Sequence, residues 1–218
     1  MIKCCIFDLD GTLFNTLPTI THYVNETLIK HGIAPITEHE CRTFIGHGAW
    51  HLIEAALASR GVIGEERVRS ILCEYNAAYN SDTLYLTALY DGVAELVAEL
   101  HRRGIALAIL SNKPDPTVKD IVSKFFDTQF TLVRGARDGT PLKPNPTALL
   151  DMAGELGISM AEIAYIGDTG IDVATGRAAG AGKSIGVSWG FREREELVAA
   201  GADAIADEPR AVLTEVLR

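Results

Sequence analysis

The sequence lacks a surplus of positive charge. Its 218 residues include 20 Lys and Arg against 29 Asp and Glu, which gives a formal net charge of −9. Binding to a nucleic-acid backbone needs clustered positive charge, so we do not expect nucleic acid to be a partner. A small anionic substrate remains compatible with this charge, because a local site can override the overall field of the protein.

The sequence also lacks long apolar runs and paired cysteines. Its longest apolar run, residues 105–110, is far shorter than the ~20 residues that cross a bilayer, and no signal-peptide cleavage pattern follows Met1. We therefore expect a cytoplasmic protein without a membrane partner. The four cysteines show no CxxC spacing, and the adjacent Cys4 and Cys5 would point to opposite faces of a strand. These absences favour buried free thiols over a disulfide framework or a zinc site.

Short apolar runs alternate with amphipathic segments of helical length along most of the chain. The apolar runs are residues 2–9, 105–110, 130–133, 163–166, 184–187 and 203–205. The helical segments are residues 93–103, 116–125, 147–156, 171–179, 193–200 and 209–217. Strands that are apolar on both faces and separated by single helices favour a parallel sheet covered on both sides. The predicted fold class is therefore α/β, with a Rossmann-like, doubly wound parallel sheet and right-handed crossovers.

One long segment interrupts this alternation. Between about residues 17 and 83 the sequence shows only helical signals, which predict helices from Leu17 and over residues 38–44, 49–60 and 65–79. An all-helical block inserted after the first strand indicates a second, smaller domain. We place the catalytic core in residues 1–14 and 86–218, and the helical domain in residues 15–85.

Four polar clusters follow predicted strands or precede predicted helices of the sheet. They are DLDGT at residues 8–12, SNK at 111–113, LKPNP at 142–146 and GDTGID at 167–172. In open α/β sheets, ligands bind beyond the carboxyl ends of the strands. Any one of these clusters alone would be read as a turn, but together they predict a single site.

The acidic residues of these clusters predict a cation. Asp8 and Asp10 are two residues apart, so in an extended chain their carboxylates would point the same way. With Asp168 and Asp172 nearby, these groups would repel one another at neutral pH unless a cation lay among them. Carboxylate oxygens are the ligands that Mg²⁺ prefers. Lys143 adds a fixed positive charge that can bind a phosphate group.

The same clusters resemble the four motifs of the haloacid dehalogenase-like (HAD) hydrolase superfamily, and the helical insertion is similar to the C1 cap of that superfamily. Within it, the chain is most similar to the phosphoglycolate phosphatase group. The residues that carry this closer resemblance are Ile45-Gly46-His47-Gly48-Ala49, Ser188-Trp189-Gly190-Phe191 and Gly201-Ala202-Asp203. Asn15 departs from the group, in which many members carry Asp at this position.

The resemblance implies a mechanism. Asp8 would attack phosphorus to form an aspartyl-phosphate, and Asp10 would act first as general acid and then as general base. Mg²⁺ would be held by the Asp8 carboxylate, the Asp10 carbonyl and Asp168, while Thr12 and Asp172 would support these ligands.

The resemblance also implies which residues bind the substrate. Ser111, the backbone of Asn112 and Lys143 would neutralise the phosphate oxygens, with Lys143 counted among the catalytic residues. His47, flanked by two glycines, is a candidate contact to a substrate carboxylate. The alternative for His47 is a side chain that merely faces solvent in a turn between helices.

The predicted function is a Mg²⁺-dependent phosphatase acting on a small phosphomonoester, with phosphoglycolate as the leading candidate. The enzyme alternatives are a phosphosugar mutase, in which the sugar replaces water as phosphoryl acceptor, and a pyrophosphatase. A third alternative is a non-catalytic module that signals when Asp8 is phosphorylated. A dehalogenase has no use for Asp10, and a phosphonatase needs a Schiff-base lysine where the helical block has only Lys30. The sequence leaves the oligomeric state open.

Overall fold

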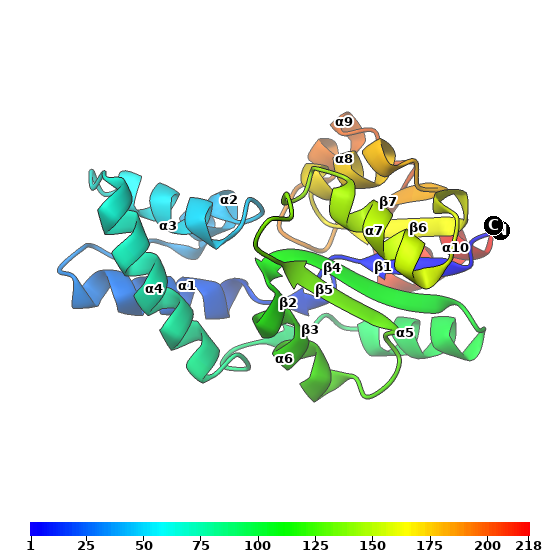
Figure 1. Cartoon of the computed structure of the whole chain (residues 1–218), viewed down its shortest axis with the longest axis horizontal. Coiled ribbons are helices and arrows are strands. Elements are labelled where there is room, and N and C mark those ends of the chain that lie inside the picture. The colour runs from blue at the N-terminus through cyan, green and yellow to red at the C-terminus, as the bar shows by residue number, and fades with distance from the viewer.

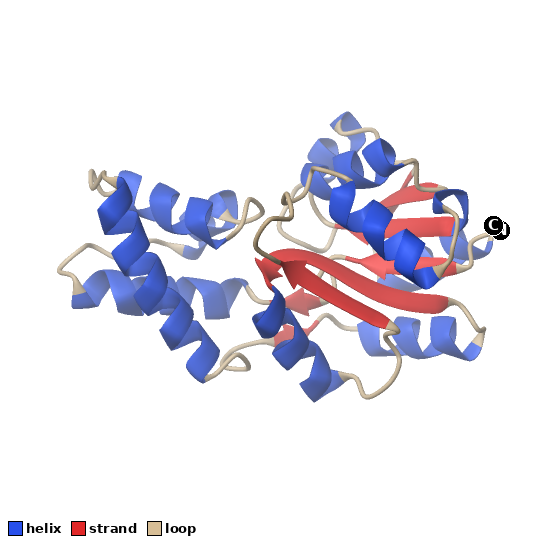
Figure 2. Cartoon of the chain, viewed as in Figure 1, coloured by secondary structure: helices blue, strands red, loops and turns tan.

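The computed structural model describes all 218 residues, as a sheet with helices on both faces and a group of four helices beside it (Figures 1 and 2). The strands of the sheet are β1 (Cys4–Phe7), β4 (Ala106–Pro114), β5 (Leu132–Ala136), β6 (Ile163–Gly167), β7 (Lys183–Val187) and β8 (Ala204–Ala206). The helices around it are α5 (Val93–Arg102), α6 (Asp115–Phe125), α7 (Thr147–Leu156), the short 3-10 helix η1 (Met160–Glu162), α8 (Gly170–Ala179), α9 (Arg194–Ala199) and α10 (Pro209–Leu217). The predicted Rossmann-like α/β fold is confirmed.

The strand order brings the carboxyl ends of β4, β1 and β6 together. The strands of the large sheet are parallel and lie in the order β5-β4-β1-β6-β7-β8. From β1 the chain builds outward through β4 to β5, and then returns to place β6 on the other side of β1. The direction of winding therefore reverses beside β1, which is where open α/β sheets bind their ligands.

The helical group contains the four helices that the sequence predicts. They are α1 (Leu17–Lys30), α2 (Glu38–Phe44), α3 (Ala49–Ala58) and α4 (Glu65–Ser81). Thr37 and Glu40 form a capping box at the start of α2, which explains why that helix begins there. The group lies to one side of the sheet, at the left of Figure 1. None of the helices in the protein has the length and apolarity needed to cross a membrane.

The burial of the cysteines matches the prediction at three of four positions. Cys5 belongs to a cluster of 37 buried residues on one face of β1, and Cys4 to a cluster of 11 on the other. Cys41 is buried as well, but Cys73 is exposed, so the expectation was wrong there. The buried positions of α4 include Ile71 and Tyr75, and Cys73 lies between them on the opposite side of the helix.

Two short strands were not predicted. β2 (Phe14–Asn15) and β3 (Ala88–Leu89) pair antiparallel where the chain leaves the sheet for the helical group and where it returns. Two residues are too few to show the alternation that identifies a strand. This pair ties together the two connections between the helical group and the sheet.

Candidate active site

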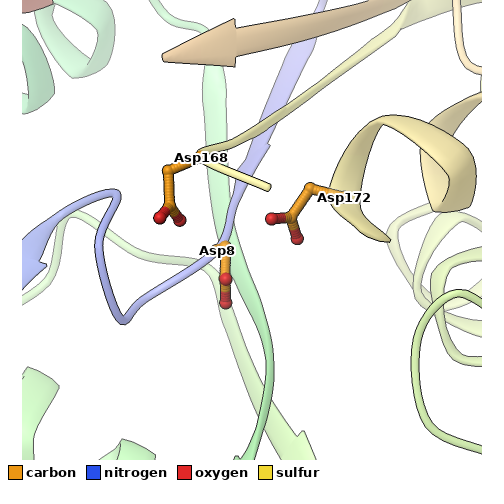
Figure 3. A group of neighbouring side chains, drawn as sticks. All are labelled: Asp8, Asp168 and Asp172. Carbon is orange, nitrogen blue, oxygen red and sulfur yellow. The ribbon is translucent and has the colours of Figure 1, made fainter. Parts of the chain in front are cut away.

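Three buried aspartates converge where β1 and β6 end (Figure 3). Asp8 directly follows β1, Asp168 directly follows β6, and Asp172 lies in the first turn of α8. One carboxylate oxygen from each lies within 4.8 Å of the other two. The structure therefore brings together the ends of two predicted strands, as the polar clusters indicated.

The start of α8 fixes the orientation of Asp172. Thr169 is the N-cap residue, and its hydroxyl and main-chain N–H donate to Asp172 Oδ2 at 2.7 Å and 3.1 Å. The other oxygen, Oδ1, accepts from Lys143 Nζ at 2.6 Å. Both oxygens of Asp172 are thus engaged within the protein, and its role in supporting the metal ligands remains a prediction.

Lys143 is a buried cation between two carboxylates. Its Nζ lies 3.0 Å from Asp8 Oδ1 and 2.6 Å from Asp172 Oδ1. Burial acts to lower the pKa of Lys143, but Asp172 and Asp8 together hold that pKa well above its ordinary value. Lys143 is therefore a permanent positive charge next to Asp8.

The remaining negative charge in the cluster is only partly compensated. Burial raises the pKa of Asp8 to about 7, an effect that Lys143 opposes and Asp172 and Asp10 reinforce. Burial, together with Asp172 and Asp8, also raises the pKa of Asp168 well above its usual range. The groups that donate to Asp168 are neutral: the Thr12 hydroxyl at 2.9 Å and the Phe191 main-chain N–H at 2.8 Å.

This donor set fits a divalent cation. Asp8 and Asp168 present hard carboxylate oxygens in one small volume, and a single lysine cannot balance all the acidic groups there. The backbone also closes tightly around Asp168. A Cβ at Gly11, where φ is +82°, would lie 2.2 Å from Asp168 Oδ2, and one at Gly190 would lie 2.3 Å from Asp168 Cβ. Only glycine allows this close approach at the two positions.

Asp10 lies outside the carboxylate cluster. Its Oδ1 accepts from the Thr16 hydroxyl at 2.6 Å and from Lys113 Nζ at 3.1 Å. In an extended chain the carboxylates of Asp8 and Asp10 would point the same way, but β1 ends at Phe7, so strand alternation does not apply to them. The structure thus places the two acids in different surroundings.

Lys113 is a site residue that the sequence analysis did not assign. Its Nζ contacts Asp10 and lies 4.3 Å from the centre of the Tyr79 ring. Burial acts to lower the pKa of Lys113, but Asp10 and Tyr79 raise it above the ordinary value. A signal was present in the sequence, because Lys113 and Ser111 are two residues apart in β4 and therefore share a face.

Ser111 and Asn112 lie within β4 and not after it as predicted, because this strand continues beyond its apolar run to Pro114. The two residues differ in what they contact. Ser111 lines the same cavity as Asp8 and is 3% exposed. The side chain of Asn112 donates to the Gly46 carbonyl at 2.9 Å and to the Lys143 carbonyl at 3.0 Å, and accepts from Lys143 N–H at 2.9 Å. Asn112 thus joins the segment that carries Lys143 to a loop of the helical group.

A cavity connects the carboxylates to the helical group. Its lining includes Tyr75 and Tyr79 of α4. It also includes Gly46 and Gly48 but not His47, which is exposed, with its ring 5.0 Å from that of His51. The structure does not bring His47 into the cavity, and a substrate contact by His47 remains a prediction.

Two further residues at the boundary of the helical group had no signal in the sequence. Arg42 of α2 and Arg192, in the loop after β7, donate to main-chain carbonyls of each other's segments. Any main-chain carbonyl can accept such a bond, so no motif marks the partners.

The comparisons with known proteins agree with this geometry. A sequence model of the haloacid dehalogenase-like hydrolases matches residues 5–187. A phosphoglycolate phosphatase of Rhodospirillum rubrum is 31% identical over 214 residues, covering 95% of this chain and 88% of the relative. An N-acetylmuramic acid 6-phosphate phosphatase of Pseudomonas aeruginosa is 30% identical over 214 residues, covering 97% and 93%. The crystal structure of a predicted phosphoglycolate phosphatase from Haemophilus somnus has a TM-score of 0.92 and 26% identity, covering 98% and 97%.

Proposed function

The chain belongs to the haloacid dehalogenase-like hydrolase family, and from this membership we propose that it is a Mg²⁺-dependent phosphatase acting on a small phosphomonoester. The observation that carries the proposal is Asp8, buried at the carboxyl end of β1, in contact with Lys143 and beside Asp168. The space at the end of β1 therefore holds a nucleophile, a fixed cation and carboxylates suited to a divalent ion.

In the proposed reaction, Asp8 supplies the nucleophile and Asp10 the proton. A bond forms between an Asp8 carboxylate oxygen and phosphorus while the bond from phosphorus to the leaving oxygen breaks. Asp10 gives its proton to the leaving oxygen, and then removes a proton from the water that attacks the aspartyl-phosphate. This second step releases inorganic phosphate and restores Asp8.

The other residues of the site bind and orient the phosphate. Lys143, the Ser111 hydroxyl and the Asn112 backbone would neutralise its oxygens, because phosphoryl transfer depends mainly on positioning and charge. Asp8, Asp168 and the Asp10 main-chain carbonyl would hold Mg²⁺. The ion, when bound, would supply the positive charge that lets a phosphate dianion approach these carboxylates.

We further propose that residues 15–85 act as a cap over the cavity, excluding bulk water and selecting the leaving group. The names of the two relatives described above point to different substrates, phosphoglycolate in one case and N-acetylmuramic acid 6-phosphate in the other. Phosphoglycolate is therefore one candidate, and family membership alone does not decide the substrate.

The proposal is tested with a panel of phosphate esters, assayed with Mg²⁺ and with EDTA. We expect Asp8→Asn to lose more than ~1000-fold in kcat, because the nucleophile is removed. Asp151→Asn, an equivalent change at an exposed position of α7, is the matched control and should retain full activity. A folded Asp8→Asn protein that kept a tenth of the activity would refute the assignment. An acyl-phosphate that accumulates without turnover would favour the signalling module instead.

A further inference from the structure

The cavity walls beyond the carboxylates indicate the chemical class of the leaving group. We propose that the cavity selects an uncharged, hydroxyl-bearing leaving group of the sugar or polyol class over one that carries a carboxylate. This inference rests on the phosphatase function proposed above, and it concerns the half of the substrate that is not phosphate.

The cationic side chains of the cavity already have carboxylate partners. Its lining contains two of them, Lys143 and Lys113. Lys143 contacts Asp8 and Asp172, and Lys113 contacts Asp10. A carboxylate on the leaving group would enter an acidic cavity without a free cation to receive it, and burying such a charge unpaired is unfavourable.

Arg42 and Arg192, at the boundary between the sheet and the helical group, donate hydrogen bonds to main-chain carbonyls. Arg42 donates to the main-chain carbonyl of Phe191, and Arg192 donates to those of Arg42 and Ile45. Neither arginine is part of the cavity lining. The helical group therefore presents a neutral surface to the leaving group.

The α4 wall of the cavity carries neutral polar groups. Tyr75, Asn76, Tyr79 and Asn80 line the cavity from two successive turns of this helix. Asn80 accepts from the Thr117 hydroxyl at 2.8 Å through Oδ1, which leaves its amide N–H groups to donate. Amide and phenol groups both donate and accept, as a substrate hydroxyl also does.

The rest of the wall is apolar. Ile20 of α1, together with Ala49 and Leu52 of α3, lines the cavity alongside the tyrosine rings. A sugar or polyol combines hydroxyl groups with C–H surface, so it can use the amides and the apolar wall at the same time. A small carboxylate such as glycolate offers little surface to the amides or to the apolar wall.

The test compares matched phosphate esters with the native protein and Mg²⁺. One pair is sorbitol 6-phosphate and 6-phosphogluconate, which differ in a terminal hydroxymethyl or carboxylate group. The second pair is 2-hydroxyethyl phosphate and phosphoglycolate. We expect kcat/KM to be at least about tenfold higher for the neutral member of each pair, the ratio that one unfavourable charge burial readily produces. Equal values, or a preference for the carboxylates, would overturn the inference.

Hexyl phosphate separates a polyol preference from a merely apolar one. We expect sorbitol 6-phosphate to be hydrolysed faster than hexyl phosphate, because the asparagines and tyrosines of α4 would lose hydrogen bonds with an alkyl chain. A higher kcat/KM for hexyl phosphate would overturn the assignment to polyols.

A charge introduced on α4 tests the location. Asn76→Lys should raise the ratio of carboxylate to neutral activity at least about fivefold, because it adds a cation to the wall. Ala77→Lys, the same change in charge on the exposed side of α4, should leave that ratio unchanged. An unchanged ratio in a folded Asn76→Lys protein would show that this wall does not contact the leaving group.

The failure of this inference is distinguishable from failure of the proposed function. Hydrolysis of the carboxylate esters in preference to the neutral ones would overturn the inference and leave the phosphatase intact. If no ester of either kind were hydrolysed with Mg²⁺ present, the phosphatase function would be refuted, and the inference with it.

Discussion

The Arg192 guanidinium donates a hydrogen bond to the main-chain carbonyl of Arg42, across the boundary between the sheet and the helical group. Arg42 in turn donates to the main-chain carbonyl of Phe191. The N–H of the same Phe191 donates to Asp168 Oδ2 at 2.8 Å. The contact that seats the helical group is therefore one residue away from the carboxylate cluster.

This relationship predicts that Arg192→Ala reduces catalysis without touching the reacting groups. We expect kcat/KM to fall about tenfold, equivalent to about 1.4 kcal/mol, because the helical group and the Phe191 segment lose their mutual support. Steady-state kinetics measure this effect. Arg194→Ala, which removes an exposed arginine paired with Asp207, is the control and should change kcat/KM less than about twofold. Equal losses in both variants would contradict the prediction.

A second prediction concerns Gly11. Gly11→Ala should lower Mg²⁺ affinity and activity by ~100-fold or more, because the added Cβ would meet Asp168 Oδ2 at 2.2 Å and displace this carboxylate. The control is Gly32→Ala, at a position that shares the positive φ (+69°) but has no atom within 4 Å of the added Cβ. Gly32→Ala should cost only about 1 kcal/mol of stability. Titrating the activity of each variant with Mg²⁺ distinguishes Gly11→Ala from Gly32→Ala. A similar Mg²⁺ dependence in both variants would contradict the close contact between residue 11 and Asp168.

A third prediction concerns Lys113, which contacts Asp10. Lys113→Met should lower kcat about tenfold or more with a smaller effect on KM, because Asp10 loses the cation that orients it. Lys113→Arg should restore part of the lost rate by keeping the charge. Lys119→Met, at an exposed lysine of α6 that pairs with Asp115, is the control. A Lys113→Met enzyme with normal kcat and a normal pH profile would show that Asp10 acts independently of Lys113.

A fourth prediction links Mg²⁺, pH and stability. The folded-state pKa of Asp8, about 7, is above its ordinary value of 3.8. Between pH 3.8 and about pH 7, the Asp8 carboxyl is ionised in the unfolded chain but protonated in the folded protein. Asp8 therefore lowers the stability of the metal-free protein as pH rises through this range. Mg²⁺ stabilises the ionised form, and the rise in Tm on adding Mg²⁺ should therefore be several °C larger at about pH 8 than at about pH 5.

Thermal melts with Mg²⁺ and with EDTA at the two pH values check this prediction. Asp8→Asn should reduce the Mg²⁺-dependent rise in Tm at the higher pH, because a carboxylate is removed from the cluster. A rise in Tm that is independent of pH, or larger in acid, would contradict the assignment of Asp8 to the metal.

Local patterns were sufficient to predict the helices and the candidate site clusters. The structure places α7 at Thr147–Leu156 and α10 at Pro209–Leu217, the ranges that the sequence predicts, because helical periodicity and the flanking prolines are read within each segment. The clustering of Asp8 with Asp168 was also predictable, since each follows a buried strand of one parallel sheet. The β2–β3 pair was not predictable in this way, because each strand is only two residues long.

The sequence by itself therefore determined the α/β core, the order of its elements, the strand ends that carry Asp8 and Asp168, and the segment before α7 that carries Lys143. Only the tertiary structure decided that Asp10 pairs with Lys113, 103 residues away, and that Arg192 reaches Arg42, 150 residues away. It also decided that α4 supplies a neutral wall to the cavity. The Asp10–Lys113 contact depends on the pairing of β1 with β4, and the other two features depend on how the helical group sits against the sheet. No local pattern encodes either arrangement, because hydrogen bonds and ion pairs between distant segments leave no fixed spacing in the chain.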